Sequence, residues 1–150
     1  KNDAQTLPLT DKVRTVAVVV LWPTLHMNSW YGVFDGEKEH TQTPLKAIKE
    51  MYGDKVNVLF EPALSYSRDK NQSGISRAVS AARCADVVIA FVGEESILRA
   101  KLTPWQILLF KGAEPAHKSI AATGKPLVVV VRAGRQLAIA DEVEVSDAVL

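Results

Sequence analysis

Four short apolar runs dominate the pattern of the chain: Val16–Val20, Val56–Phe60, Val87–Val92 and Leu127–Val131. Each is rich in β-branched residues, and most are apolar at consecutive positions rather than at every second one. A strand with one wet face alternates polar and apolar residues, whereas a strand covered on both faces is apolar throughout. The runs therefore predict buried parallel strands with helices on both sides of the sheet.

Helical patterns lie between these runs. Thr43 and Pro44 form a typical N-cap and first-turn pair, which opens a helix over Pro44–Met51. Apolar residues recur with a period of about 3.6 across Ser73–Arg83, the spacing of an amphipathic helix. Two further helices are predicted, one from Pro104 to near Gly112 and one from Pro115 to Thr123-Gly124.

The regular alternation of strands and helices predicts the fold class. It indicates an α/β protein with an open, doubly wound parallel sheet of four to five strands, a flavodoxin-like three-layer sandwich. A fifth strand is expected to begin within Val145–Leu150. The length of 150 residues fits a single domain over 1–150, with a linker at residues 1–12.

Composition excludes several classes of function. Hydrophobic residues make up 47% and charged residues 23%, as in globular proteins. The net charge of +1 gives no reason to expect nucleic acid, and no apolar run is long enough to cross a membrane. The first residues carry no signal-peptide pattern and read as the interior of a longer chain, so the sequence assigns no compartment.

The chemistry-bearing residues predict neither a cofactor nor a metal. No glycine-rich nucleotide fingerprint is present, and His26, His40 and His117 lack the spacing of metal ligands. The one cysteine, Cys84, excludes an internal disulfide. It falls at the end of a helical pattern, and we expect it to be a small, half-buried apolar residue.

Several separate segments carry a resemblance to a known family. They are KNDAQTLPL (Lys1–Leu9), VFDGEKEHTQTPLKAI (Val33–Ile48), SYSRD (Ser65–Asp69), ADVVIAFVGEES (Ala85–Ser96) and TGKPLVVVVRAGRQLAI (Thr123–Ile139). In this order they resemble the C-terminal α/β sandwich domain of glycoside hydrolase family 3 β-glucosidases. With the intervening strands and helices, the resemblance covers most of the chain.

The resemblance implies a division of catalytic labour. In that family a separate barrel domain supplies the nucleophilic aspartate, and the C-terminal domain supplies an acid/base glutamate a few residues beyond the position of Leu98. Retaining glycosidases need both carboxylates, about 5–5.5 Å apart. This chain reads Arg99-Ala100-Lys101-Leu102 at that place. No residue inherits the acid/base role, which is not transferred to Glu94 or Glu95, and we expect no glycosidase activity from the chain alone.

Other departures from the family pattern gather at the predicted carboxyl ends of the strands. Val20 stands where glycine is usual, and further departures are Ala63, Arg132 and Gln136. They mark altered loops at about residues 20–32 and 99–119. Departures concentrated at one edge of an otherwise family-like chain predict an engineered or redesigned domain.

The altered loops hold a dense apolar cluster, which includes all three tryptophans of the chain. Its members are Trp22, Leu25, His26, Met27, Trp30, Trp105, Ile107, Leu108, Leu109 and Phe110. Leaving so many large side chains exposed would forfeit many kcal/mol, at roughly 25 cal/mol per Å² of apolar surface. Three interpretations stay open: a sealed core patch, a pocket for an apolar small molecule, or a homodimer interface.

Few polar groups near this cluster are suited to chemistry. His26 as general base and Ser29 as nucleophile are the candidate catalytic residues of an artificial hydrolase. Candidate ligand-binding residues are Trp22, Leu25, Met27, Trp30, Glu94, Lys101, Trp105, Leu108 and Arg132. Among them, Lys101 is a candidate for Schiff-base chemistry, and Arg132 for an anion or for pairing with Glu94.

Three functions follow from these observations. The first is an engineered scaffold with an artificial apolar or hydrolase-type site. The second is a non-catalytic structural or sugar-binding domain of a family 3 glycoside hydrolase, in which Trp22, Trp30 and Trp105 stack on sugar rings. The third is a homodimerisation surface.

Overall fold

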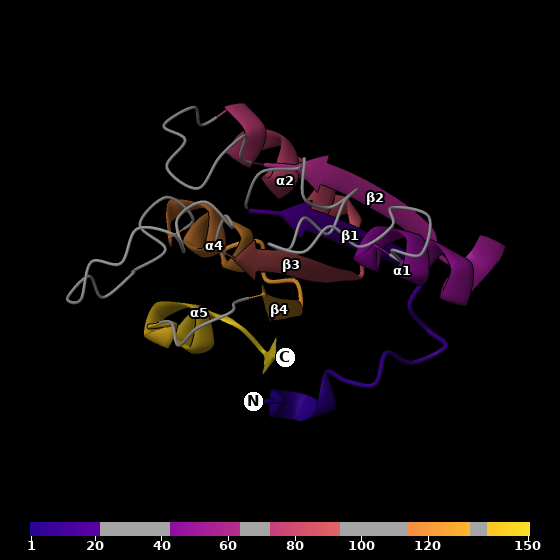
Figure 1. Cartoon of the computed structure of the whole chain (residues 1–150), viewed down its shortest axis with the longest axis horizontal. Coiled ribbons are helices and arrows are strands. Elements are labelled where there is room, and N and C mark those ends of the chain that lie inside the picture. Colours follow the sequence, from indigo (N-terminus) through magenta and orange to yellow (C-terminus); the bar gives the residue numbers. More distant parts are fainter. Residues whose placement is uncertain (22–42, 64–72, 94–113, 133–137) are drawn as a thin grey trace, which may run out of the picture.

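The computed structural model of the chain describes residues 1–21, 43–63, 73–93, 114–132 and 138–150. Within these ranges one parallel sheet forms, with the strand order β2-β1-β3-β4-β5 (Figure 1). Its strands are β1 (Thr15–Val20), β2 (Asn57–Pro62), β3 (Val87–Gly93), β4 (Leu127–Arg132) and β5 (Ala148–Val149). This is the strand order of flavodoxin-like sheets, and the predicted fold class is confirmed.

Four α-helices lie in the described ranges: α1 (Pro44–Tyr52), α2 (Ser73–Cys84), α4 (Glu114–Ala121) and α5 (Ala140–Val145). Short 3₁₀ turns occur at η1 (Asp3–Gln5) and η4 (Gly53–Lys55). The hydroxyl of Thr43 accepts the backbone N–H of Lys46 at 3.2 Å, which confirms the predicted cap of α1. The helix predicted at 104–112 lies outside these ranges. Helix α5 was not predicted, because six residues that include three acids give no clear period.

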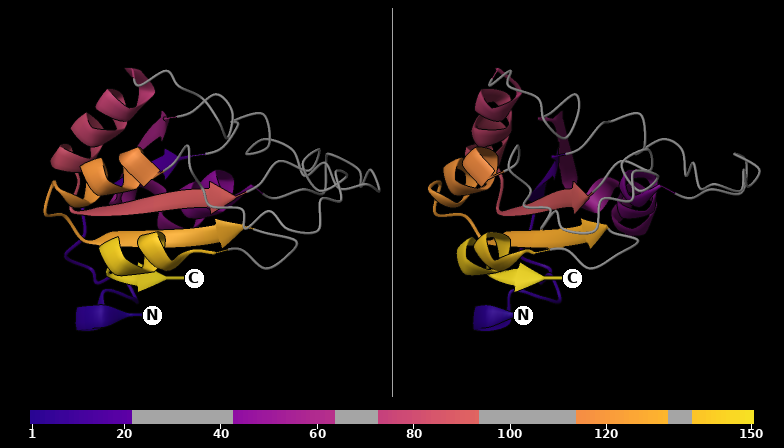
Figure 2. Two further views of the ribbon diagram at one scale, coloured as in Figure 1. Left: turned by 90° about the vertical axis from the view of Figure 1, so that its left-hand side faces the viewer. Right: turned by 60° about the vertical axis from the view of Figure 1, so that its left-hand side comes forward.

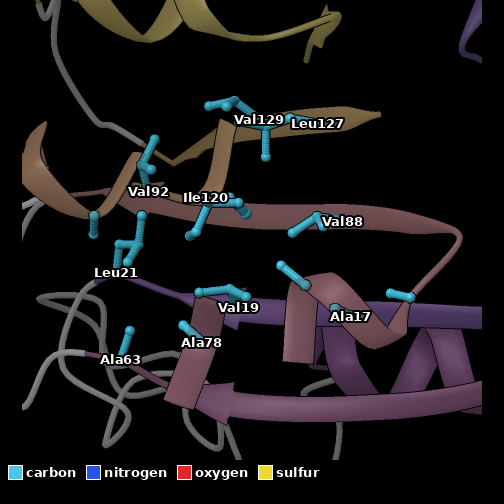
Figure 3. Packing of buried hydrophobic residues seen from close by; sticks show 14 residues of the cluster. Ala17, Val19, Leu21, Ala63, Ala78, Val88, Val92, Ile120, Leu127 and Val129 are labelled. Atoms are coloured by element: carbon cyan, nitrogen blue, oxygen red, sulfur yellow. The ribbon is translucent and has the colours of Figure 1, made fainter. Parts of the chain in front are cut away.

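The two faces of the sheet are covered differently. Helices α2, α4 and α5 pack on one face, and α1 packs on the other, as the two views of Figure 2 show. The first face carries Val19, Val88 and Leu127, which meet Ala78 of α2 and Ile120 of α4 (Figure 3). Successive strand residues point to opposite faces, so a run that is apolar throughout supplies both cores at once.

The second face is covered in part by the N-terminal segment, residues 1–13. Leu7, Leu9 and Val13 pack against the same core cluster as α1. Asn2 forms an antiparallel bridge with Ala148 of β5, and the Lys1 carbonyl accepts the Val149 amide at 3.0 Å. The segment therefore lies along the outer edge of β5. The single-domain assignment and the linker boundary at residue 12 stay predictions.

Two carboxylates close the amino edge of the sheet in the same way. Oδ2 of Asp86 accepts the backbone N–H groups of Arg14 and Thr15, each at 2.8 Å, just where β1 begins. Oδ2 of Asp147 accepts the N–H of Leu127 at 2.8 Å, where β4 begins. Each aspartate also donates its own N–H to the carbonyl of its partner, Thr15 or Leu127, at 2.9 Å. The hydrogen bonds from Arg14 and Thr15 hold the pKa of Asp86 below its usual value.

The prediction for Cys84 was wrong. This residue ends α2 as expected, but it is exposed rather than half-buried. Helix α2 buries Gly74, Ala78 and Ala82, a stripe spaced by four residues. Two positions beyond Ala82, a helical side chain has turned by about 200°, so Cys84 faces away from the sheet.

Candidate functional site

The candidate site lies at the carboxyl edge of the sheet, between β1 and β3. The chain leaves β1 toward β2 on one side and leaves β3 toward β4 on the other, so the direction of the connections reverses between these two strands. In open α/β sheets, ligands bind at such a reversal, outside the carboxyl ends of the strands. Figure 2 shows β3 and β4 ending at this same edge.

Backbone pairing brings the ends of the central strands to one level. Val20 lies opposite Phe91, and the N–H of Leu21 donates to the Phe91 carbonyl at 3.0 Å. The N–H of Ala63 donates to the Val20 carbonyl at 3.0 Å. Val20 thus continues β1 as a regular, fully buried strand residue. The ends of β1, β2 and β3 are therefore held together by backbone hydrogen bonds, and this base precedes the segments that follow each strand.

Helix α2 begins directly behind this base. A Cβ atom added to Gly74 would lie 2.7 Å from the carbonyl carbon of Ala63 and closer still to its oxygen. Only glycine permits this approach, because real Cβ contacts are not so short. The start of α2 is therefore fixed against the end of β2.

Two charged groups of the described part lie at the ends of strands here. Glu61 of β2 forms an ion pair with Arg77 of α2, with Oε2 and Nε 3.3 Å apart. Arg132 ends β4, is half-buried, and lies beside Gly93 of β3. Its position matches the expectation of a cation at the carboxyl edge. Its predicted roles, anion binding or pairing with Glu94, stay predictions because Glu94 is outside the described residues.

Most of the predicted site residues lie outside the described part of the chain. They are Trp22, Leu25, His26, Met27, Ser29, Trp30, Glu94, Lys101, Trp105 and Leu108. The segments that carry them follow β1 and β3 in the sequence, at the two strands that border the reversal. The catalytic pair and the apolar pocket stay predictions.

A buried pair of ionisable residues was not predicted from the sequence. His117 of α4 and Glu142 of α5 are buried, with Nδ1 and Oε1 3.5 Å apart. The sequence held only a local indication of burial for each residue. His117 lies three residues before the buried Ile120, and Glu142 lies three residues before Val145, which packs on the core. Each therefore shares the inner face of its helix, but nothing in the sequence joins the two.

Three further observations concern other features of the described ranges. No group of three potential metal ligands occurs there, and no helix in them is long and apolar enough to span a membrane. A cavity of about 280 Å³ lies at the opposite, amino edge. It is lined in part by Thr6, Leu9, Asp86, Pro126 and Asp147.

Known structures share this arrangement of strands and helices. A β-glucosidase from Listeria innocua, solved in complex with isofagomine, matches with a TM-score of 0.80 at 21% identity. The match covers 99% of this chain and 20% of that one. A family 3 β-glucosidase from Bifidobacterium adolescentis matches with a TM-score of 0.81 at 21% identity, covering 99% and 22%. At this identity the likeness establishes the fold.

Curated relatives agree with the structural matches. A periplasmic beta-glucosidase from Salmonella typhimurium is 31% identical over 173 residues, covering 100% of this chain and 22% of the relative. A probable exo-1,4-beta-xylosidase from Aspergillus clavatus is 29% identical over 138 residues, covering 91% and 17%. The chain thus spans about a fifth of the length of these relatives. The model of the glycosyl hydrolase family 3 C-terminal domain matches residues 1–150, and the chain belongs to that family.

Proposed function

We propose that this chain serves as the non-catalytic, sugar-facing domain of an exo-acting family 3 glycosidase. The observation that carries the proposal is the extent of the match. The family model covers the whole chain, while the chain covers only 22% of a β-glucosidase and 17% of a probable β-xylosidase. One relative is named as a beta-glucosidase and the other as a probable exo-1,4-beta-xylosidase, so β-linked glucosides and xylosides are the substrate class we propose.

The chemistry at the carboxyl edge supports a binding role rather than a catalytic one. Retaining glycosidases need two carboxylates that flank the scissile bond. Glu61 of the described edge is committed to Arg77, and the sequence has no carboxylate where the family resemblance places the acid/base. Bond cleavage would then depend on residues outside this chain, and the isolated chain should not hydrolyse glycosides.

Aromatic residues that follow β1 and β3 in the sequence are suited to holding a sugar. Trp22 and Trp30 follow β1 in the sequence, and Trp105 follows β3. Tryptophan offers a large apolar face with a polar edge, which suits the mixed surface of a pyranose ring. Arg132, at the end of the neighbouring strand, adds fixed hydrogen-bond donors.

Tryptophan fluorescence tests the proposal, since all three tryptophans of the chain follow β1 or β3. The chain is titrated with glucose, xylose and their methyl β-glycosides, and aryl β-glucoside and β-xyloside turnover is assayed in parallel. We expect saturable fluorescence changes without turnover above background. Turnover by the chain alone, or no fluorescence response to any of these sugars, would contradict the proposal.

Arg132→Ala sharpens the titration, with Arg83→Ala as its matched control. Arg83 is exposed near the end of α2, close to the amino edge. Loss of a charged hydrogen bond to a bound sugar weakens binding about ten-fold, from a net contribution of roughly 1.5 kcal/mol. We expect this weakening in Arg132→Ala and an unchanged affinity in Arg83→Ala. Equal affinities in both variants would remove Arg132 from the site.

The engineered-scaffold interpretation receives no support from the family relationships, and it stays a prediction. It rests on His26 and Ser29, and on an apolar pocket whose residues lie beyond the described part. Ester turnover that disappears in His26→Ala would revive it. The homodimer interpretation likewise stays a prediction, and sedimentation of the chain would test it.

A further inference from the structure

Two ionisable side chains are buried in the described core. His117 of α4 is 2% exposed and Glu142 of α5 is 3% exposed. The two helices pack against each other, and both cover the face of the sheet that carries Leu127 and Val129. Removing a charge or an unpaired polar group from water is costly. A buried histidine facing a buried glutamate therefore calls for a physical reason.

The geometry of the pair is close but incomplete. Nδ1 of His117 lies 3.5 Å from Oε1 of Glu142, within ion-pair range, yet neither ring nitrogen of His117 has a hydrogen-bond partner among the described residues. A buried donor or acceptor left without a partner costs about 1–3 kcal/mol. A movement of Nδ1 toward Oε1 by a fraction of an ångström would convert the contact into a hydrogen bond.

Other charges near the pair are solvated. On α5 itself, Asp141 and Glu144 are exposed, and on α4 so is Lys118. The elements packed against the two helices carry Arg77 and Arg83 on α2, both exposed, and the half-buried Arg132 on β4. Arg77 is engaged with Glu61. Within the described residues, the charge that His117 meets at close range in the core is that of Glu142.

We propose that His117 and Glu142 form a proton-operated latch between α4 and α5. With a neutral imidazole the pair lacks a charged hydrogen bond. When a proton from solvent binds the imidazole, Nδ1–H becomes a charged donor to the Glu142 carboxylate, and a charge-assisted hydrogen bond ties the helices together. Removal of that proton releases the bond.

The latch would hold together the two helices that lie behind the carboxyl edge of the sheet. Helix α4 is the element after β3, and α5 is the element after β4 in the described part of the chain. Both strands end at the carboxyl edge, so the latch fixes the two helices that begin behind that edge (Figure 2). The latch itself does not depend on sugar binding. Only its effect on the carboxyl edge rests on the proposed function.

The sign of the pH dependence follows from proton linkage. The proposed bond forms only in the folded protein with His117 protonated, so it adds stability as the pH falls through the range in which histidine residues titrate, about pH 8 to 5. Glu142→Gln keeps the shape of the side chain and removes its charge, so this gain should vanish. Glu144→Gln, on the exposed side of the same helix, is the matched control.

Urea unfolding of the chain at pH 5.5, 6.5, 7.5 and 8.5 tests the latch. Between pH 8.5 and 5.5, we expect the folded-to-unfolded ratio of the wild type to rise about ten-fold more than that of Glu142→Gln. Glu144→Gln should follow the wild type. Parallel profiles for the wild type and Glu142→Gln would overturn the proposal.

A second measurement covers the case in which Glu142→Gln does not fold. In the wild type, NMR follows the His117 ring, assigned with His117→Asn, together with the backbone amides of α5. We expect the ring and the amides of Val143 and Glu144 to shift with one common midpoint. A His117 ring that does not titrate, or that titrates without moving the α5 amides, would refute the latch whatever the sugar titrations give.

Discussion

The two edges of the sheet are finished in different ways. At the amino edge, the carboxylates of Asp86 and Asp147 accept backbone N–H groups that begin β1 and β4. At the carboxyl edge, the backbone bonds of Leu21 and Ala63 simply extend the ladder by one residue. One edge is closed by side chains of the domain itself, and the other leads into the segments that follow β1, β2 and β3 in the sequence.

This contrast separates stability from function. Bonds that close the amino edge are made within the domain and need no partner. The carboxyl edge instead ends in buried strand residues, such as Val20 of β1 and Val92 of β3. Binding residues on loops above a rigid scaffold are the usual arrangement in α/β proteins.

The largest loss of stability is expected at Gly74, where the start of α2 packs against the end of β2. In Gly74→Ala the new Cβ collides with the backbone of Ala63, which cannot rotate away. We expect a loss of about 3 kcal/mol in the free energy of unfolding, the upper range for overpacking. Urea unfolding measures it.

Gly124→Ala is the control for this substitution. Gly124 has a φ of +71° and nothing within 4 Å of an added Cβ, so only backbone strain of about 1 kcal/mol opposes alanine there. If Gly74→Ala were no less stable than Gly124→Ala, the start of α2 would not be fixed against β2 as described.

A smaller effect is expected at the amino edge. Asp147→Ala removes the side-chain acceptor of the Leu127 N–H, so this amide at the start of β4 loses its hydrogen bond to the carboxylate. We expect a loss of about 1–2 kcal/mol by urea unfolding. Asp54→Ala, an exposed aspartate in η4, should change stability by less than about 0.5 kcal/mol. Equal losses in the two variants would mean that the cap contributes nothing.

The smallest effect concerns acid. Because backbone N–H groups of Arg14 and Thr15 lower the pKa of Asp86, its stabilising contribution is present above the unfolded pKa of about 4 and is lost as the pH falls through the lower, folded value. Asp86→Asn should therefore lose less stability than the wild type between pH 5 and 2. Because the carboxylate is exposed, the effect is small, and thermal unfolding curves at several pH values measure it. Identical slopes would contradict the assignment.

The sequence predicted the sheet well because both of its faces are buried. A run such as Val16–Val20 is apolar at every position, and this pattern is typical of a short strand covered by helices on both sides. Helix ends with chemical markers were also predictable: the Thr43 cap opens α1 at Pro44, as expected.

Residues that act through distant partners were not predictable in this way. Glu142 and His117 lie 25 positions apart, and each alone reads as a polar residue on a helix. Helix α5 is short and acidic, so it carries no strong period. The strand-end position of Arg132 was predictable because it directly follows an apolar run, whereas Trp22 and Trp105 lie outside the described residues, so their roles stay predictions.

The bridge between Asn2 and Ala148 has a consequence for how the chain reaches its native state. Parallel sheets are assembled from contacts between residues far apart in the chain, and such topologies fold slowly because long loops must close before any contact is gained. The pairing of residues 1–3 with β5 is the extreme case, since it encloses nearly the whole chain. During synthesis, residues 1–3 could not make this pairing until β5 had left the ribosome.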